Sequence, residues 1–236
     1  MKYDFYLDMR ERRSHTLILG KVKPGSVVLE LGPSTGIMTN YLKNNLNCKV
    51  YICEIDEASI QIARLYAEGF WLGDLDSLAW ADFFASIKFD YILCADVLEH
   101  LRKPESVLQK TGGLLKEEGS VLLSMPNVAH NSVVFDLLDN KFEYTEVGIL
   151  DKTHLKFYTY SSLKQLCLDA GYTPVEEDAI YLEYLPPGAE KYPDSILFRK
   201  YGHVFQFIFE LKKTEYMQEH NIEPANKIIE YPPRRG

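Results

Sequence analysis

The sequence predicts an α/β fold in which helices cover both faces of a mostly parallel sheet. Short runs rich in β-branched and aromatic residues alternate with stretches of helical periodicity, a pattern typical of βαβ units. The run FDYILCA at 89–95 is nearly all apolar, as expected for a central strand that is buried on both faces. At 27–44 a strand leads through a turn of small residues into a helix, which favours a loop that passes close to a ligand.

Each element follows from local signals. Strands are predicted at 26–31, 49–54, 70–73, 89–95, 120–124, 173–184 and 203–213. Helices are predicted at 37–44, 57–66, within 75–86, from Pro104 onward, and at 161–170. Proline suits the first position of a helix because its missing N–H is not needed there. The last two strands have little helix between them, which predicts an antiparallel pair at one edge of the sheet.

Length and composition favour one globular domain. The chain has 236 residues, of which 46% are hydrophobic and 25% charged, as in ordinary folded proteins. No apolar run approaches the roughly 20 residues of a membrane helix, and the charged start is unlike a signal peptide. The four cysteines form no C-x-x-C pair, which favours buried reduced thiols in the cytoplasm.

The excess of acidic over basic residues indicates which macromolecules the chain can bind. The net charge is −8, whereas tight binding of a phosphate backbone requires a basic face. We therefore predict no nucleic-acid partner and no membrane partner. The sequence leaves the oligomeric state open, with a homodimer as one option.

The turn after the first strand reads E-x-G-x-S-x-G over residues 30–36. A dinucleotide-binding G-x-G-x-x-G would require glycine at positions 32, 34 and 37, where the chain has Gly32, Ser34 and Ile37. A Walker Gly-Lys-Ser/Thr is also absent. A turn of this kind is weak evidence alone, so its weight depends on the motifs that follow.

Four further features follow in a fixed order. Glu54 ends the second strand, Gly73-Asp74-Leu75 follows the third, VLEHL ends the stretch 89–101, and LLKEEGSVLLSMPN occupies 114–127. With the turn at 30–36, this order resembles the class I S-adenosylmethionine-dependent methyltransferases. The segments 148–159 and 161–172 resemble those of family members that act on sugars or other small hydroxylated molecules.

The resemblance implies a Rossmann-like, seven-stranded, mostly parallel sheet with an antiparallel C-terminal strand. It implies a single methyltransferase domain over 1–213 and a C-terminal tail over 214–236. Within the domain, we expect residues 1–23 to form a helical lid, and 128–160 and 185–201 to be insertions on the acceptor side. Tyr3 and Tyr6 are candidate lid residues, and Tyr181 and Tyr184 are candidates for one side of the acceptor pocket.

The resemblance also implies roles for side chains toward S-adenosylmethionine. The implied cofactor-binding residues are Glu30, Gly32, Ser34, Gly36, Glu54, Asp56, Asp74, Leu75, Ala95 and Asp96. Among them, Glu30 would bind the amino group of the methionine part, Glu54 the ribose hydroxyls and Asp74 the adenine amino group. Local structural roles stay open beside these: Glu30 and Asp74 could order their loops, the glycines could serve turn geometry alone, and Asp56 could cap the next helix.

A hydroxyl acceptor benefits from a base, because a hydroxyl attacks poorly until its proton leaves. Histidine titrates near neutral pH, and we choose His154 as the catalytic residue, with Asp151 nearby to orient it. His100 and His130 are alternatives, whereas His15, His203 and His220 lie outside the motifs. No metal ligands are assigned.

The predicted function is methyl transfer from S-adenosylmethionine to a hydroxyl of a small molecule such as a sugar or a nucleotide-linked sugar. Two alternatives remain: N-methylation of a small amine, and a regulatory module that binds S-adenosylmethionine without chemistry. Residues 125–127 read Met-Pro-Asn, where enzymes that methylate base amino groups carry Asn/Asp-Pro-Pro-Tyr. This difference argues against a nucleic-acid methyltransferase.

Overall fold

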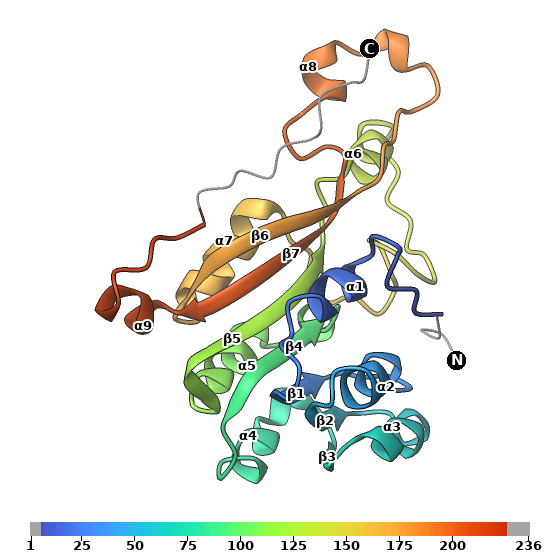
Figure 1. Cartoon of the computed structure of the whole chain (residues 1–236). Coiled ribbons are helices and arrows are strands. Elements are labelled where there is room, and N and C mark those ends of the chain that lie inside the picture. Colours follow the sequence, from blue (N-terminus) through green and yellow to red (C-terminus); the bar gives the residue numbers. More distant parts are fainter. Residues whose placement is uncertain (1–5, 226–236) are drawn as a thin grey trace.

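The sheet has seven strands in the order β3-β2-β1-β4-β5-β7-β6. The computed structural model describes residues 6–225 of the chain (Figure 1). The strands are β1 (Val27–Leu31), β2 (Lys49–Glu54), β3 (Gly69–Leu72), β4 (Phe89–Ala95), β5 (Leu115–Pro126), β6 (Tyr172–Tyr181) and β7 (Val204–Lys213). Pairs among β1 to β5 are parallel, and β7 runs antiparallel to both β5 and β6. The predicted fold class is confirmed.

Helices pack on both faces of this sheet. The helices α1 (Ser14–Leu19), α2 (Ile37–Asn44) and α3 (Glu57–Ala63) share one core cluster, and α4 (Ala79–Phe83), α5 (Pro104–Gly112) and α7 (Tyr160–Asp169) share the other. Alternate residues of β1 divide between the faces: Val28 packs with the first group, and Leu29 and Leu31 pack with the second. Apolar side chains on both faces explain why the central strands are almost entirely hydrophobic.

The strand order reverses direction at β1. The chain moves from β1 to β2 and β3 on one side, and then crosses to β4 on the other side. In open α/β sheets, ligands bind outside the carboxyl ends of the strands at such a reversal. The loops after β1, β2 and β4 therefore meet where a ligand is expected.

Two segments interrupt the alternation. Residues 127–159 contain α6 (Asn131–Leu138) and a long loop, and residues 182–203 contain the short helices η4 (Ala189–Lys191) and α8 (Asp194–Leu197). Figure 1 shows the α8 segment beyond α6, far from α2 and α3. Asn131 fastens it there, donating a 2.8 Å hydrogen bond from Nδ2 to the carbonyl of Leu197.

Several predicted boundaries shift. The predicted helix at 57–66 consists of α3 and a 3-10 turn, η1 (Arg64–Tyr66), and β5 begins at Leu115 rather than at residue 120. A short helix, α9 (Thr214–Glu219), follows β7, and its Met217 is buried. Across residues 6–225, no helix combines the length and apolar character required to cross a membrane.

Candidate active site

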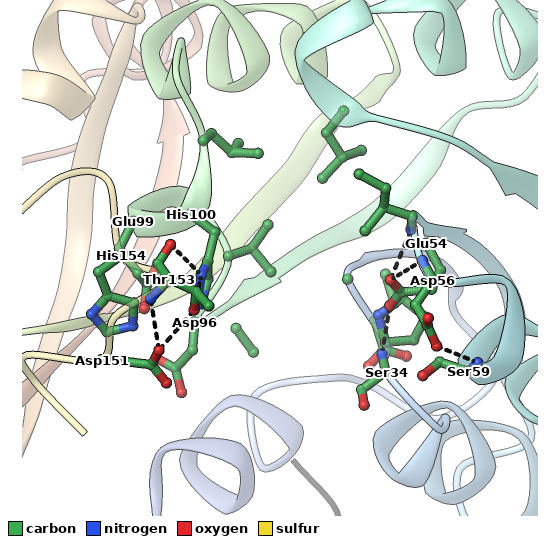
Figure 2. A pocket seen from close by; sticks show the side chains of 18 of the residues that line it. Ser34, Glu54, Asp56, Ser59, Asp96, Glu99, His100, Asp151, Thr153 and His154 are labelled. Atoms are coloured by element: carbon green, nitrogen blue, oxygen red, sulfur yellow. Dashed lines mark hydrogen bonds between the residues drawn. The ribbon is translucent and has the colours of Figure 1, made fainter. Parts of the chain in front are cut away.

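A cavity of about 1350 Å³ opens at the carboxyl ends of β1, β2 and β4. Figure 2 shows two groups of polar side chains on its opposite sides. One group, here called the cofactor wall, comprises Ser34, Glu54 and Asp56, together with Glu30, which lines the same cavity and interacts electrostatically with Glu54. The other, the acceptor wall, comprises Glu99, His100, Asp151, Thr153 and His154. Sites for one small ligand usually measure about 300–1,000 Å³, so this cavity has room for two reactants.

Glu30 lies near the end of β1 and is buried. Its Oε2 accepts a 2.7 Å hydrogen bond from the Thr39 hydroxyl on α2. The pKa of Glu30 is raised to about 7, mainly by burial; the Thr39 hydrogen bond opposes this shift, and the nearby Glu54 adds to it. A buried carboxylate at this position would favour a cationic partner such as an ammonium group.

The turn after β1 is held in a left-handed conformation. Gly32, Ser34 and Gly36 have φ values of +67°, +50° and +80°. A Cβ on Gly32 would lie 2.8 Å from Val97 Cγ2, and a Cβ on Gly36 would lie 2.7 Å from the Cα of Ala63 on α3. Gly32 and Ser34 line the cavity, whereas Gly36 allows α2 and α3 to approach each other closely.

Glu54 joins the first two loops of the cofactor wall. Its Oε2 accepts a 2.9 Å bond from the Ser34 amide, and its Oε1 accepts bonds of 2.7 and 2.9 Å from the amides of Ile55 and Asp56. A carboxylate has about four acceptor positions. Three are occupied by the backbone, so one remains for a ligand hydroxyl.

Asp56 and Asp74 both line the cavity and both cap helices. Asp56 Oδ2 accepts a 2.7 Å bond from the Ser59 amide at the start of α3. Hydrogen bonds with the side chain and then the backbone of Ser59 lower the pKa of Asp56. Asp74 begins the 3-10 helix η2 (Leu75–Ser77), and its Oδ2 accepts a 2.6 Å bond from Arg102. The capping role that the sequence left open for Asp56 is present in the structure.

The other predicted cofactor residues also line the cavity: Leu75, Ala95 and Asp96. Asp96 follows β4 with a φ of +55°. Its Oδ1 accepts a 2.8 Å bond from the Ser124 hydroxyl and another bond from Gln206 Nε2. These contacts from β5 and β7 fix the carboxylate, which Figure 2 shows on the same side of the cavity as Asp151 and Thr153.

His154 lies in the loop after α6, and its imidazole ring contacts that of His100, with the ring centroids 4.7 Å apart. Its Nδ1 lies 2.9 Å from the Ile149 carbonyl oxygen, so this nitrogen donates and Nε2 carries the lone pair. Asp151 accepts bonds of 2.9 and 2.8 Å from the amide and hydroxyl of Thr153. The partner of His154 Nδ1 is therefore a backbone carbonyl rather than the Asp151 side chain suggested by the sequence.

Sequence reasoning missed two residues of this cavity. Glu99, in the 3-10 helix η3 (Leu98–His100), is 1% exposed, and burial raises its pKa well above the usual range. His15 on α1 also lines the cavity, and burial lowers its pKa. Glu99 belongs to the VLEHL motif, so the sequence could have indicated it as a site residue. His15 lies far from every motif in the sequence.

Other sequence-predicted residues lie away from the cavity. His130 is buried and is not among the residues that line the cavity, and its Nε2 lies 2.8 Å from the Leu182 carbonyl oxygen. Tyr6 is 83% exposed, and Tyr3 lies outside the described residues. Tyr181, Tyr184 and residues 185–201 are not among the residues that line this cavity.

Known proteins show clear similarity to this chain. A family model described as a methyltransferase domain matches residues 5–177. A ubiquinone biosynthesis O-methyltransferase of Psychrobacter arcticus is 28% identical over 173 residues, which cover 69% of this chain and 64% of that protein. A protein of the same name from Nitrosococcus oceani is 27% identical over 199 residues, covering 76% and 81%. The chain thus spans just under two thirds of the first relative.

The fold also resembles solved structures. That of 1,6-didemethyltoxoflavin-N1-methyltransferase from Burkholderia thailandensis, bound to S-adenosylhomocysteine and 1,6-didemethyltoxoflavin, has a TM-score of 0.55 and 18% identity, covering 85% of this chain and 76% of that one. The family match confirms the predicted methyltransferase domain, and S-adenosylhomocysteine, which is bound in the Burkholderia thailandensis enzyme, is the product form of the cofactor that the sequence predicts. The chain belongs to this methyltransferase-domain family.

Proposed function

We propose that this protein transfers a methyl group from S-adenosylmethionine to a hydroxyl of a small molecule. One observation carries the proposal: a single cavity of about 1350 Å³ has Ser34 and Glu54 on one wall and His154 on the other. Donor and acceptor can therefore meet inside it. When bound, S-adenosylmethionine supplies a methyl group that is already activated on a sulfonium.

The residues of the cofactor wall suit the polar groups of that molecule. Glu54 keeps one acceptor position for a ribose hydroxyl, and Glu30 offers a buried carboxylate to the ammonium group. Asp74 and Leu75 also line the cavity and would hold the adenine. This wall binds and orients its ligand, because in-line transfer requires the reacting atoms to be aligned at about 3–3.5 Å.

His154 is proposed to help activate the acceptor hydroxyl. Its Nε2 lone pair is left available by the Nδ1 contact with Ile149. An amine acceptor needs only to be unprotonated, whereas a hydroxyl must lose its proton as it attacks. The rate loss caused by His154→Ala therefore distinguishes O-methylation from N-methylation.

Two acceptor classes have support. The likeness of residues 148–172 to enzymes of hydroxylated substrates favours a sugar or a nucleotide-linked sugar. The two relatives described above are named for ubiquinone biosynthesis, which favours an intermediate of that synthesis. Both classes of acceptor carry hydroxyl groups, so we propose O-methylation. Assays with a panel of acceptors will identify the substrate.

Calorimetry with S-adenosylmethionine is the first test. We expect micromolar binding, equivalent to about −8 kcal/mol. No binding would refute the proposed function. Release of S-adenosylhomocysteine is then measured with nucleotide-linked sugars and with ubiquinone-biosynthesis intermediates. Binding without turnover on any member of either set would favour the non-catalytic regulatory module.

We further propose that residues 1–213 work as one cytoplasmic methyltransferase domain, with the N-terminal segment as a lid and residues 128–160 on the acceptor side. Arg13 and His15 from the first of these segments, and His154 from the second, line the cavity. The four cysteines are buried, unbridged thiols, which suits a reducing compartment. Light scattering of the purified protein will decide between a monomer and a homodimer, which the sequence leaves open.

A further inference from the structure

The acceptor wall brings together three side chains of the types that bind metal ions. Glu99, His100 and His154 each offer one ligand atom, and these atoms lie within 4.8 Å of one another. Glu99 and His100 come from η3 after β4, and His154 comes from the loop 55 residues further along the chain. Figure 2 shows them converging on one side of the cavity. We propose that they form a binding site for a divalent transition-metal ion that acts on the acceptor oxygen.

Glu99 provides the first independent support. Its side chain is almost completely buried, and neither carboxylate oxygen has a hydrogen-bond partner among the described residues. A buried carboxylate without partners is costly, by several kcal/mol when it is ionised. A cation bound between Glu99 and the two imidazoles would compensate this cost directly.

The histidine tautomers provide the second support. His154 Nδ1 lies 2.9 Å from the Ile149 carbonyl oxygen, and His100 Nδ1 lies 3.2 Å from the Thr153 carbonyl oxygen. A carbonyl only accepts, so both Nδ1 atoms carry hydrogen and both Nε2 atoms carry a lone pair. Metal-binding histidines are oriented in this way, with the second nitrogen donating to a carbonyl or a carboxylate.

The backbone holds the two ligand segments together. The carbonyl oxygen of Glu99 accepts bonds of 2.8 and 3.1 Å from the amides of Leu155 and Lys156. Leu155, which follows His154, is therefore hydrogen-bonded to Glu99, which precedes His100. Asp151 secures the same loop through its two bonds with Thr153. The three ligand side chains are thus positioned before any ion binds.

The ligand set indicates the kind of ion. Two imidazoles and one carboxylate suit Mn²⁺, Fe²⁺, Co²⁺ or Zn²⁺, whereas Mg²⁺ prefers oxygen ligands. Three protein ligands leave coordination positions open, as in catalytic rather than structural metal sites. The acceptor oxygen would take one of these positions, and the positive charge would lower the pKa of its hydroxyl.

This site deepens the proposed function and rests on it for the role of the ion. The acceptor hydroxyl would lose its proton to water, its oxygen would form the new O–CH₃ bond, and the electron pair of the broken S–CH₃ bond would stay on sulfur. His154 would then serve as a metal ligand, and the ion would take over the activating role. The proposal departs from the sequence-based expectation that the chain has no metal ligands.

The test uses Mn²⁺ alone, added to chelator-treated full-length protein without cofactor or acceptor. Electron paramagnetic resonance reports the loss of the free-ion signal. We expect one bound Mn²⁺ per chain, binding weakened by about 10–100-fold or more in Glu99→Gln and in His154→Ala, and weaker competition by Mg²⁺ than by Zn²⁺. His220→Ala is the matched control, because His220 is an exposed histidine after α9 and should leave binding unchanged.

No saturable binding to the wild-type protein would overturn the proposal. Equal binding by the wild-type protein, Glu99→Gln and His154→Ala would also overturn it. Calorimetry with S-adenosylmethionine on the same samples verifies that each variant is folded, because the cofactor wall lies on the opposite side of the cavity. Cofactor binding without Mn²⁺ binding would refute the metal site alone, whereas the reverse result would refute the proposed function.

Discussion

Two buried glutamates on opposite walls of the cavity differ in their hydrogen bonding. Glu54 on the cofactor wall is 7% exposed and accepts three backbone hydrogen bonds. Glu99 on the acceptor wall is 1% exposed and has no hydrogen-bond partner for either oxygen among residues 6–225. A glutamate thus holds two loops together on the cofactor wall, whereas a glutamate on the acceptor wall has carboxylate oxygens without hydrogen-bond partners among residues 6–225.

The difference separates two ways of building a binding site. On the cofactor wall, the carboxylate is satisfied by the chain itself, so the loops after β1 and β2 are held in position before a ligand arrives. On the acceptor wall, burial without partners raises the free energy of the unliganded protein, and a ligand can relieve it. Variants on each wall should therefore fail in different measurements.

The largest expected effect concerns the acceptor wall. His154→Ala removes the available Nε2 and should lower kcat by about 10²–10⁴-fold with a hydroxyl acceptor, the usual contribution of a group that assists proton removal. Steady-state assays of S-adenosylhomocysteine formation measure it. The Kd of S-adenosylmethionine should stay within about twofold of the wild-type value, since His154 lies on the wall opposite Glu54. A parallel loss of cofactor affinity would contradict the division into two walls.

The cofactor wall should show the reverse behaviour. Glu54→Ala removes a ligand acceptor and leaves the amides of Ser34, Ile55 and Asp56 without their partner. We expect S-adenosylmethionine to bind about 10–100-fold more weakly, or ~1.5–3 kcal/mol, by calorimetry. Glu57→Gln is the control, because Glu57 is an exposed acid in the first turn of α3. If both variants bind equally well, Glu54 has only a structural role.

Much of the cofactor wall could be predicted from the sequence because its signals are local. A strand, a turn of small residues and a helix follow one another within residues 27–44, and Glu54 directly ends the next strand. Apolar runs with short turns between them also located all seven strands. The start of β5 was missed because Lys116, Glu117 and Glu118 are exposed, so that part of the strand has no apolar pattern.

The acceptor wall depends on contacts that leave little trace in the sequence. His154 reaches Glu99 and His100 because backbone amides of its loop bond to the carbonyl of Glu99, and any residue except proline can donate such a bond. The orienting partner of His154 is likewise a carbonyl, that of Ile149. Side-chain reasoning proposed Asp151 instead, since a backbone acceptor has no residue-specific signal.

Two glycines allow a test of how closely α2 and α3 must approach each other behind the turn after β1. Gly25 and Gly36 have nearly equal φ values, +78° and +80°, but a Cβ on Gly25 would meet nothing within 4 Å, whereas one on Gly36 would lie 2.7 Å from the Cα of Ala63. Both alanine variants carry the left-handed strain. Gly36→Ala should therefore be less stable than Gly25→Ala by about 1–2 kcal/mol in urea unfolding. Equal stabilities would mean that α2 and α3 can separate freely.

The smallest expected effect is a pH dependence of cofactor binding through Glu30. Its pKa is about 7 because of burial, so the ionised fraction rises from roughly one tenth at pH 6.0 to roughly three quarters at pH 7.5. Only the ionised form attracts the ammonium group of S-adenosylmethionine. Affinity measured by calorimetry should therefore increase roughly eightfold over this range, and binding near pH 7 should release protons.

Glu30→Gln decides whether Glu30 is the source of that dependence. Its affinity should be nearly constant between pH 6.0 and 7.5, because the amide has no charge to gain. His15 lines the same cavity, but burial lowers its pKa, so it should already be neutral over most of this range. A pH dependence that persists in Glu30→Gln would assign the titration to His15 or to the ligand. If the affinity of Glu30→Gln does not change with pH, Glu30 is the titrating group. Glu30 would then be a buried carboxylate of the cofactor wall that, unlike Glu54, depends on the ligand to compensate its charge.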